Sequence, residues 1–197
     1  MRTNLLFGLA MVLLVACGSA GTGTDGGSGQ LAIRRVFVTS ARYNGDFKTI
    51  GAGNDGLEGA DRLCNTVAQG AGVPGTYTAW LSSPTVDAID RIQDVGPWYQ
   101  ITADGGAIKT FNNRANMASA PLAAIQYTES GIQVFSGAVW TGTDTGGRKT
   151  SQNCKGFTSQ SPELGTTGTI ASTSGWTSNG GAGANCSDDN YLYCFQQ

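Results

Sequence analysis

The chain contains no histidine among its 197 residues. Histidine is the commonest general base and the commonest metal ligand in proteins, and this chain has no histidine for either role. Nucleophiles that depend on a neighbouring imidazole, as in serine–histidine and cysteine–histidine enzymes, are excluded outright.

Charged residues are also scarce, at 13% of the chain, with 12 basic and 14 acidic residues and a formal net charge of -2. No basic run extends beyond the pair Arg34 and Arg35. Binding to nucleic acid or to polyanionic glycans needs clustered positive charge, so the composition argues against both as main partners.

Catalytic carboxylate pairs are not evident either. Two carboxylates can hydrolyse a glycoside without histidine, but their separation must suit the mechanism. The candidates Asp61, Asp104 and Glu129 show no spacing that supports such a pair. We therefore expect a protein that is not an enzyme and that needs no cofactor.

The N-terminus lacks an apolar run long enough to span a bilayer, yet it begins like an export signal. Arg2 is followed by an apolar stretch from Leu5 to Ala16. The stretch ends in Leu14-Val15-Ala16-Cys17, which resembles the lipobox of bacterial lipoproteins, in which the cysteine is lipidated. Residues 1–16 are then a signal peptide and Cys17 becomes the membrane anchor; the alternative is a plain secretory signal with an incidental cysteine.

The residues that follow Cys17 indicate where a lipoprotein would be located and how its domain would be attached. Gly18, and not an aspartate, follows Cys17. By resemblance to Gram-negative lipoproteins, this favours an outer-membrane location in the cell envelope. Residues 17–30 are rich in Gly, Ser and Thr, so we expect a flexible tether and a folded domain over residues 31–197.

Four cysteines remain after Cys17, and an even number in an exported domain indicates disulfides. No pair has the CxxC spacing of a zinc site. Spacing alone leaves all three pairings open, and buried free thiols are the alternative to pairing. The four residues are Cys64, Cys154, Cys186 and Cys194.

The clearest helix signal lies between residues 55 and 72. Apolar residues recur at helical spacing on one face that includes Cys64, and Asp55 and Glu58 have the spacing of a capping box. Gly70 and Gly72 end the helix. Strands are expected at 35–40, 76–82, 98–101, 139–141 and 191–195, a short second helix within 85–95, and mostly loop from 143 to 189. These patterns predict an α+β fold.

The order of the motifs resembles that of a domain family of unknown function in bacterial lipoproteins, and of the endostatin domain of collagens, which has a C-type-lectin-like fold. The motifs are Gly59–Cys64, Gly75–Ser83, Val139–Asp144 with Gly147-Arg148, Cys154, Cys186, and Leu192–Cys194. The resemblance implies a mixed, mostly antiparallel sheet with one or two helices, long loops, and two nested disulfides, Cys64–Cys194 and Cys154–Cys186.

Several properties of those relatives are not carried over. Endostatin binds zinc and heparin through histidines and clustered arginines, which this chain lacks. The Glu-Pro-Asn, Gln-Pro-Asp and Trp-Asn-Asp triplets of calcium-dependent lectins are also missing, which argues against ordinary calcium-dependent sugar binding. The paired active-site cysteines of formylglycine-generating enzymes have no evident counterpart. No metal site is predicted.

Candidate ligand-binding residues lie in the loops near the C-terminus. Trp176 could stack on a sugar ring while Ser178 and Asn179 hydrogen-bond its hydroxyls; alternatively, Trp176 fills a core beneath the loop. Asp188 and Asp189 carry oxygen ligands that suit calcium, although a solvated turn is the simpler interpretation.

These observations lead to one leading hypothesis and two alternatives. The leading one is a lipid-anchored surface protein whose domain binds a glycan or protein ligand, without catalysis, through the loops of residues 155–190. The second is a structural or assembly protein of the cell envelope without a small ligand. The third, a hydrolase, has the least support in the sequence.

Overall fold

The computed structural model describes residues 33–197. The predicted signal peptide, Cys17 and the tether of residues 17–30 lie outside the described residues. Within residues 33–197, no helix is both long enough and apolar enough to cross a membrane.

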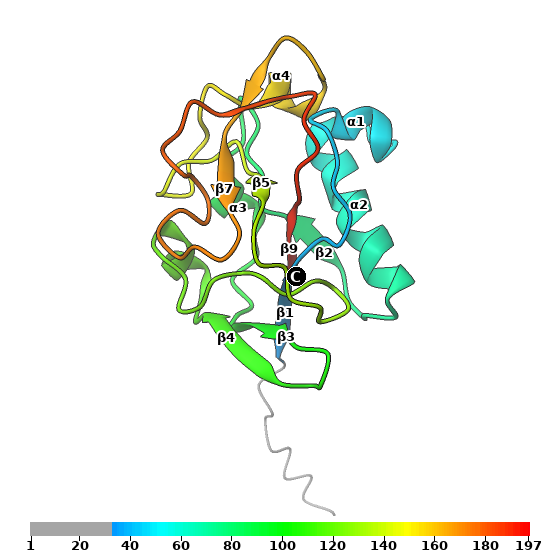
Figure 1. The fold of residues 1–197 in the computed structure, drawn as a ribbon, viewed down its shortest axis with the longest axis vertical. Helices are drawn as coiled ribbons and strands as arrows, with labels where there is room; N and C mark the ends of the chain where they lie inside the picture. Colours follow the sequence, from blue (N-terminus) through cyan, green and yellow to red (C-terminus); the bar gives the residue numbers. More distant parts are fainter. Residues whose placement is uncertain (1–32) are drawn as a thin grey trace, which may run out of the picture. The chain divides into compact units, whose positions relative to one another are not determined.

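A five-stranded sheet forms the centre of the domain, in the order β2-β9-β1-β3-β4 (Figure 1). The first and last strands along the chain, β1 and β9, are neighbours in this sheet, with Val36 opposite Phe195 and Phe37 opposite Cys194. β1 and β3 are parallel, and the other neighbouring pairs are antiparallel. The strands are β1 (Arg34–Val38), β2 (Tyr77–Ala79), β3 (Trp98–Ile101), β4 (Ala107–Phe111) and β9 (Tyr193–Gln196).

Shorter elements complete an α+β fold with mostly antiparallel strands, as the sequence predicts. Two small antiparallel ladders pair β5 (Ala138–Trp140) with β7 (Thr167–Thr169) and β6 (Leu164–Gly165) with β8 (Ala184–Asn185). The helical elements are α1 (Phe47–Ile50), α2 (Gly56–Gly70), α3 (Ala88–Arg91), the 3-10 turn η1 (Arg114–Ala118) and α4 (Cys154–Phe157).

Helix α2 begins and ends where the sequence signals lie. The Asp55 side chain accepts a hydrogen bond from the Glu58 backbone N–H at 2.8 Å, which caps the helix. The Glu58 carboxylate in turn accepts from the Asn54 N–H at 2.7 Å, one residue before the position that a standard capping box uses. At the other end, Gly72 has a φ of 67°, a conformation in which glycine follows a helix without steric cost.

Side chains of α2 cover the open edge of β2. Asn65 donates to the Tyr77 carbonyl at 2.8 Å and accepts from the Tyr77 N–H at 2.9 Å. The Asp61 carboxylate accepts from the Ala79 N–H at 2.8 Å and pairs with Arg91 through both of its oxygens. The bonds to Tyr77 and Ala79 occupy backbone groups that a further strand would otherwise pair with, so this edge of the sheet is protected.

The two faces of the sheet bury two different cores, because successive side chains of a strand point to opposite sides. The helix-side core packs beneath α2. It consists of Phe37, Phe47, Ala60, Leu63, Cys64, Ala68, Val73, Tyr77, Ala79, Leu81, Trp140, Cys154, Phe157, Cys186, Leu192 and Cys194.

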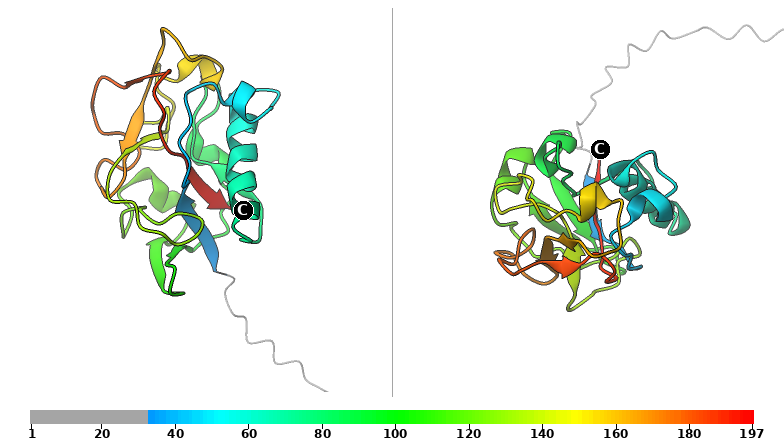
Figure 2. Two further views of the ribbon diagram at one scale, coloured as in Figure 1. Left: turned by 45° about the vertical axis from the view of Figure 1, so that its right-hand side comes forward. Right: turned by 90° about the horizontal axis from the view of Figure 1, so that it is seen from above.

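The loops and the β5–β7 ladder cover the opposite face of the sheet (Figure 2), and the aromatic core is buried on that face. It consists of Val36, Val38, Trp80, Ala88, Ile92, Trp98, Phe111, Met117, Ile125, Val139, Ile170, Trp176, Tyr191, Tyr193 and Phe195.

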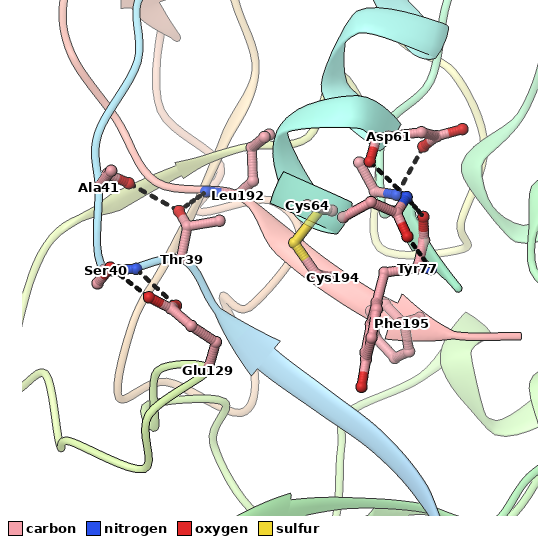
Figure 3. Close-up of a disulfide and its surroundings, with 12 residues drawn as sticks. Thr39, Ser40, Ala41, Asp61, Cys64, Tyr77, Glu129, Leu192, Cys194 and Phe195 are labelled. Carbon is pink, nitrogen blue, oxygen red and sulfur yellow. Dashed lines mark hydrogen bonds between the residues drawn. A yellow bond between two sulfur atoms is a disulfide. The ribbon is translucent and has the colours of Figure 1, made fainter. Parts of the chain in front are cut away.

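Two disulfides cross-link the helix-side core. Cys64 on α2 is bonded to Cys194 in β9 across 130 residues (Figure 3), and Cys154 is bonded to Cys186 across 32. The pairing is the nested one that the resemblance implies. The outer bond fixes the long helix to the last strand, and the inner bond closes the loops that precede that strand.

Some elements differ from the sequence prediction. The helix expected within 85–95 is the single turn α3, and the strand expected over 191–195 begins at Tyr193. Tyr191 instead forms an isolated bridge with Val139. Strand β4 was not foreseen, although the turn-forming Asp104-Gly105-Gly106 between it and β3 is a hairpin signal.

Candidate functional site

The most unusual backbone in the domain is the left-handed turn α4. Its four residues all have positive φ: 51° at Cys154, 56° at Lys155, 73° at Gly156 and 59° at Phe157. This conformation is costly for residues that carry a Cβ, and it persists where the surroundings over-determine it. Residues held in such conformations cluster at functional sites.

Both ends of α4 are held by the helix-side core. Cys154 forms the inner disulfide, and the buried Phe157 ring stacks on Phe47 with ring centroids 5.2 Å apart. Between these two anchors, the backbone of Lys155 and Gly156 is carried to the surface in a fixed orientation.

Three segments meet at this turn. An added Cβ on Gly56, at the start of α2, would lie 2.1 Å from the Gly156 carbonyl oxygen, so that contact requires glycine. An added Cβ on Gly156 would lie 3.2 Å from Pro84. The start of α2, the turn α4 and the loop of residues 83–86 are therefore packed against one another.

Two hollows flank Pro84 at this junction, and we name them together the Pro84 groove. The first, of about 290 Å³, is lined by Asp55, Leu57, Ser83, Pro84, Thr85, Val86, Lys155, Gly156 and Thr158. The second, of about 370 Å³, is lined by Pro84, Lys149, Thr150, Ser151 and Asn153.

The groove is rich in hydroxyl groups, and both of its lysines are paired with carboxylates. Lys155 pairs with Glu163 at 2.9 Å, and Lys149 pairs with Asp87 at 3.4 Å. A hydrogen bond from the Lys149 backbone N–H, helped by the nearby basic side chains, holds the pKa of Asp87 below its ordinary value. A ligand that enters the groove therefore meets hydroxyls, two paired lysines and the Asp55 carboxylate, which caps α2.

The groove lies at the end of the domain where α4 is found, and β1 begins at the opposite end (Figures 1 and 2). The described chain therefore enters the domain far from the groove. A ligand could reach the groove without passing the point where the chain enters.

Trp176 lies in the aromatic core and is 1% exposed. Its ring is 4.8 Å from that of Trp80 and 5.2 Å from that of Phe111, and its N–H donates to the Ser119 carbonyl at 3.1 Å. Neighbouring rings cover the surface that a sugar would need, so the predicted stacking role is replaced by the alternative, a core residue beneath the loop.

The other predicted ligand residues stay at the surface but do not line the groove. Asn179 is exposed and its side chain accepts from the Gly181 N–H at 3.0 Å, which closes a turn. Asp188 accepts from the Asn185 N–H at 3.1 Å and has the same role in another turn. Ser178 is half-buried and Asp189 is exposed.

The structure offers no metal-binding cluster in residues 33–197: no three His, Cys, Asp or Glu side chains are grouped so that they could hold an ion. Asp188 and Asp189 thus have no third acidic partner in the described part of the chain.

Sequence reasoning located the groove only in part. Lys155, Gly156 and Thr158 belong to the loops of residues 155–190 in which binding was predicted, but the segments 83–86 and 149–153 were not selected. The signal available was modest: Ser83 and Thr85 place hydroxyls on both sides of a turn-forming proline, and Thr150-Ser151 is a second pair of hydroxyl residues in a loop.

A search with models of known protein families finds no match to this chain, and a search of curated proteins finds none either.

Proposed function

We propose that this protein is a lipid-anchored envelope protein whose domain binds a neutral, hydroxyl-rich ligand, a glycan, in the Pro84 groove without catalysis. The observation that carries the proposal is the groove itself: two adjoining hollows whose hydroxyls and paired charges are presented by a strained turn that the core fixes.

The chemistry of the groove favours a neutral polar ligand over an ion. Hydroxyl and amide groups can both donate and accept hydrogen bonds, which matches the hydroxyls of a sugar. Because Lys149 and Lys155 each have a carboxylate partner, an anionic ligand would have to displace one of these contacts. The groove has no aromatic lining residue, so we expect edge contacts with hydroxyls and not ring stacking.

Two further proposals accompany this one. The nested disulfides, the antiparallel pairing of the first and last strands and the long loops support a C-type-lectin-like fold. The lipobox-like Leu14–Cys17 supports anchoring in the bacterial outer membrane. With β1 beginning at the end opposite the groove, an anchored domain could present the groove to the surroundings.

The anchor is tested by Cys17→Ala in the full chain. We expect the variant protein to leave the membrane fraction, because no acyl chains would then be attached. Cys154→Ala in the same host serves as a control that alters a cysteine but not the anchor. Membrane retention of Cys17→Ala equal to that of the parent would refute lipidation at this residue.

The groove is tested by glycan-array binding of the full chain, with Thr85→Arg as a blocking variant and Thr173→Arg as a matched control. Both threonines are exposed, but Thr173 does not line the groove. We expect Thr85→Arg to weaken glycan binding at least tenfold and Thr173→Arg to leave it unchanged. Equal binding by the two variants would remove the groove from the proposal, and stable self-association without glycan binding would favour the assembly role.

A further inference from the structure

A second cleft, of about 240 Å³, lies at the other end of helix α2. It is lined by Arg35, Ala71, Gly72, Val73, Ile101, Thr102, Ala103, Glu129, Ser130 and Gly131. The Pro84 groove includes Asp55 and Leu57 at the start of the same helix. Since an α-helix rises 1.5 Å per residue, the 15 residues of α2 separate the two sites by roughly 20 Å.

The cleft contains a nearly buried carboxylate. Glu129 is 8% exposed, and it accepts hydrogen bonds from the backbone N–H of Ser40 at 3.0 Å and from the Ser40 hydroxyl (Figure 3). Ser40 uses both carboxylate oxygens, but each oxygen can accept a further hydrogen bond.

The end of α2 adds further negative character. Backbone carbonyls at a helix C-terminus carry partial negative charge, which a basic side chain usually offsets. The last turn of α2 contains no basic residue, and Ala71 and Gly72, which follow it, line the cleft.

Arg35 supplies the positive charge of the cleft. Arg35 and Glu129 both line the cleft, and the ion pairs formed within residues 33–197 include neither of them. A guanidinium can bind a carboxylate through two parallel hydrogen bonds.

The walls of the cleft are held in place. Gly131 has a φ of 77°, and an added Cβ there would lie 2.4 Å from the Ala103 nitrogen. The Ala103 N–H donates to the Gly131 carbonyl at 3.1 Å, which ties the loop that carries Glu129 to the turn after β3. The site is therefore largely formed before any ligand enters.

We infer that this cleft binds a small zwitterion of the α-amino acid type, with the carboxylate on Arg35 and the ammonium on Glu129 and the carbonyls that end α2. A lone anion would be repelled by Glu129 and the helix end, and a lone cation would be repelled by Arg35. A molecule that carries both charges satisfies both sides. The volume lies below the range typical of drug-sized ligands, which suits a molecule of this size.

The test compares three probes on the full chain by saturation-transfer NMR: glycine, glycinamide and acetate. Glycine carries both charges, glycinamide lacks the carboxylate and acetate lacks the ammonium. We expect glycine to bind at least tenfold more tightly than either of the other two. Absence of glycine binding, or equal binding of glycine and acetate, would overturn the inference.

Variants locate the binding. Arg35→Gln and Glu129→Gln are each expected to weaken glycine binding at least tenfold, whereas Arg62→Gln, an equivalent change on the exposed face of α2, leaves it unchanged. Thermal unfolding confirms that each variant is folded. Glu129→Gln also changes the hydrogen bonds to Ser40 and could loosen the loop that carries residue 129. In that case Arg35→Gln and the comparison of the three probes still test the inference. Unaltered glycine binding by Arg35→Gln would overturn the inference.

Discussion

The helix-side core and the aromatic core differ in how they are held together. The helix-side core contains both disulfides and one tryptophan, Trp140, whereas the aromatic core contains no cysteine and three tryptophans, Trp80, Trp98 and Trp176. One face of the sheet is therefore cross-linked covalently, and the other depends on the packing of large rings.

Contacts without a covalent link join distant residues in both cores. In the helix-side core, the Trp140 N–H donates to the Tyr43 carbonyl, 97 residues away. In the aromatic core, the Trp80 N–H donates to the Thr177 hydroxyl, 97 residues away, and Trp176 packs directly on Trp80. The loop that carries Trp176 contributes little regular structure of its own. The packing of large buried rings thus stabilises the loop-covered face of the sheet, whereas a long helix and disulfides stabilise the other face.

The largest expected effect comes from removing the outer disulfide. Because the stabilisation grows with the length of the closed loop, Cys64→Ala with Cys194→Ala should cost about 5 kcal/mol, and Cys154→Ala with Cys186→Ala about 4 kcal/mol. Urea unfolding of the two double variants measures the difference. Hydrogen exchange should show faster opening of α2 than of β3 in the first variant; a greater loss of stability from the inner pair would contradict the ranking.

The aromatic core is tested by Trp176→Ala. Since the side chain is buried among other rings, its loss should leave a cavity and cost about 3–5 kcal/mol in the free energy of unfolding. Phe135→Ala is the matched control, because Phe135 is 74% exposed and its loss should change stability by less than about 0.5 kcal/mol. A loss below about 1 kcal/mol for Trp176→Ala would show that this face does not depend on ring packing.

A smaller effect is expected where α2 covers the edge of β2. Asp61→Asn would leave Arg91, whose side chain is 9% exposed, without its counter-charge, at a cost of about 2 kcal/mol. Glu58→Gln, on the same helix, breaks a pair in which both side chains are well exposed, and we expect a much smaller loss of stability. Chemical denaturation of both variants makes the comparison, and equal losses would show that Asp61 has no special role at the edge.

The smallest expected effect is the pH dependence of the surface contact between Asp87 and the segment of Lys149. The pKa of Asp87 is below its ordinary value of 3.8 in the folded state, so its ionised form favours folding. This contribution is present above pH 3.8 and is lost as the pH falls through the folded-state pKa.

Asp87→Asn should therefore lower stability slightly near pH 6, and the difference from the parent should disappear near pH 2. Unfolding curves across that range measure it, with the exposed Asp189→Asn as control. A difference that persists unchanged at low pH would assign the effect to something other than the charge of Asp87.

The elements that the sequence predicted well are those whose signals are local. Asp55, the apolar face around Cys64 and the closing glycines define α2 within a few residues, and Trp98–Ile101 was placed at its observed bounds. Strand β4 was missed because its five residues, in which Lys109 is exposed, carry a weak alternation.

The candidate site was predicted less well, for a physical reason. The hydroxyl residues of segments 83–86 and 149–153 lie in ordinary loops, and the fold brings these loops together around Pro84. No short-range pattern in the sequence predicts this contact. Trp176 posed the opposite problem, since a tryptophan in a loop of small residues is equally compatible with a ligand platform and a buried plug. Only its burial beneath Trp80 and Phe111 distinguishes the two.

The sequence by itself determined the α+β class, the capped helix and the exclusion of histidine-based chemistry, because composition and short-range periodicity are properties of the chain alone. The tertiary structure decided the rest: the division into two cores, the left-handed turn that lines the Pro84 groove, and the placing of Arg35, Glu129 and the end of α2 around one cleft. These features depend on contacts between residues far apart in the chain, whose geometry exists only after the sheet has formed.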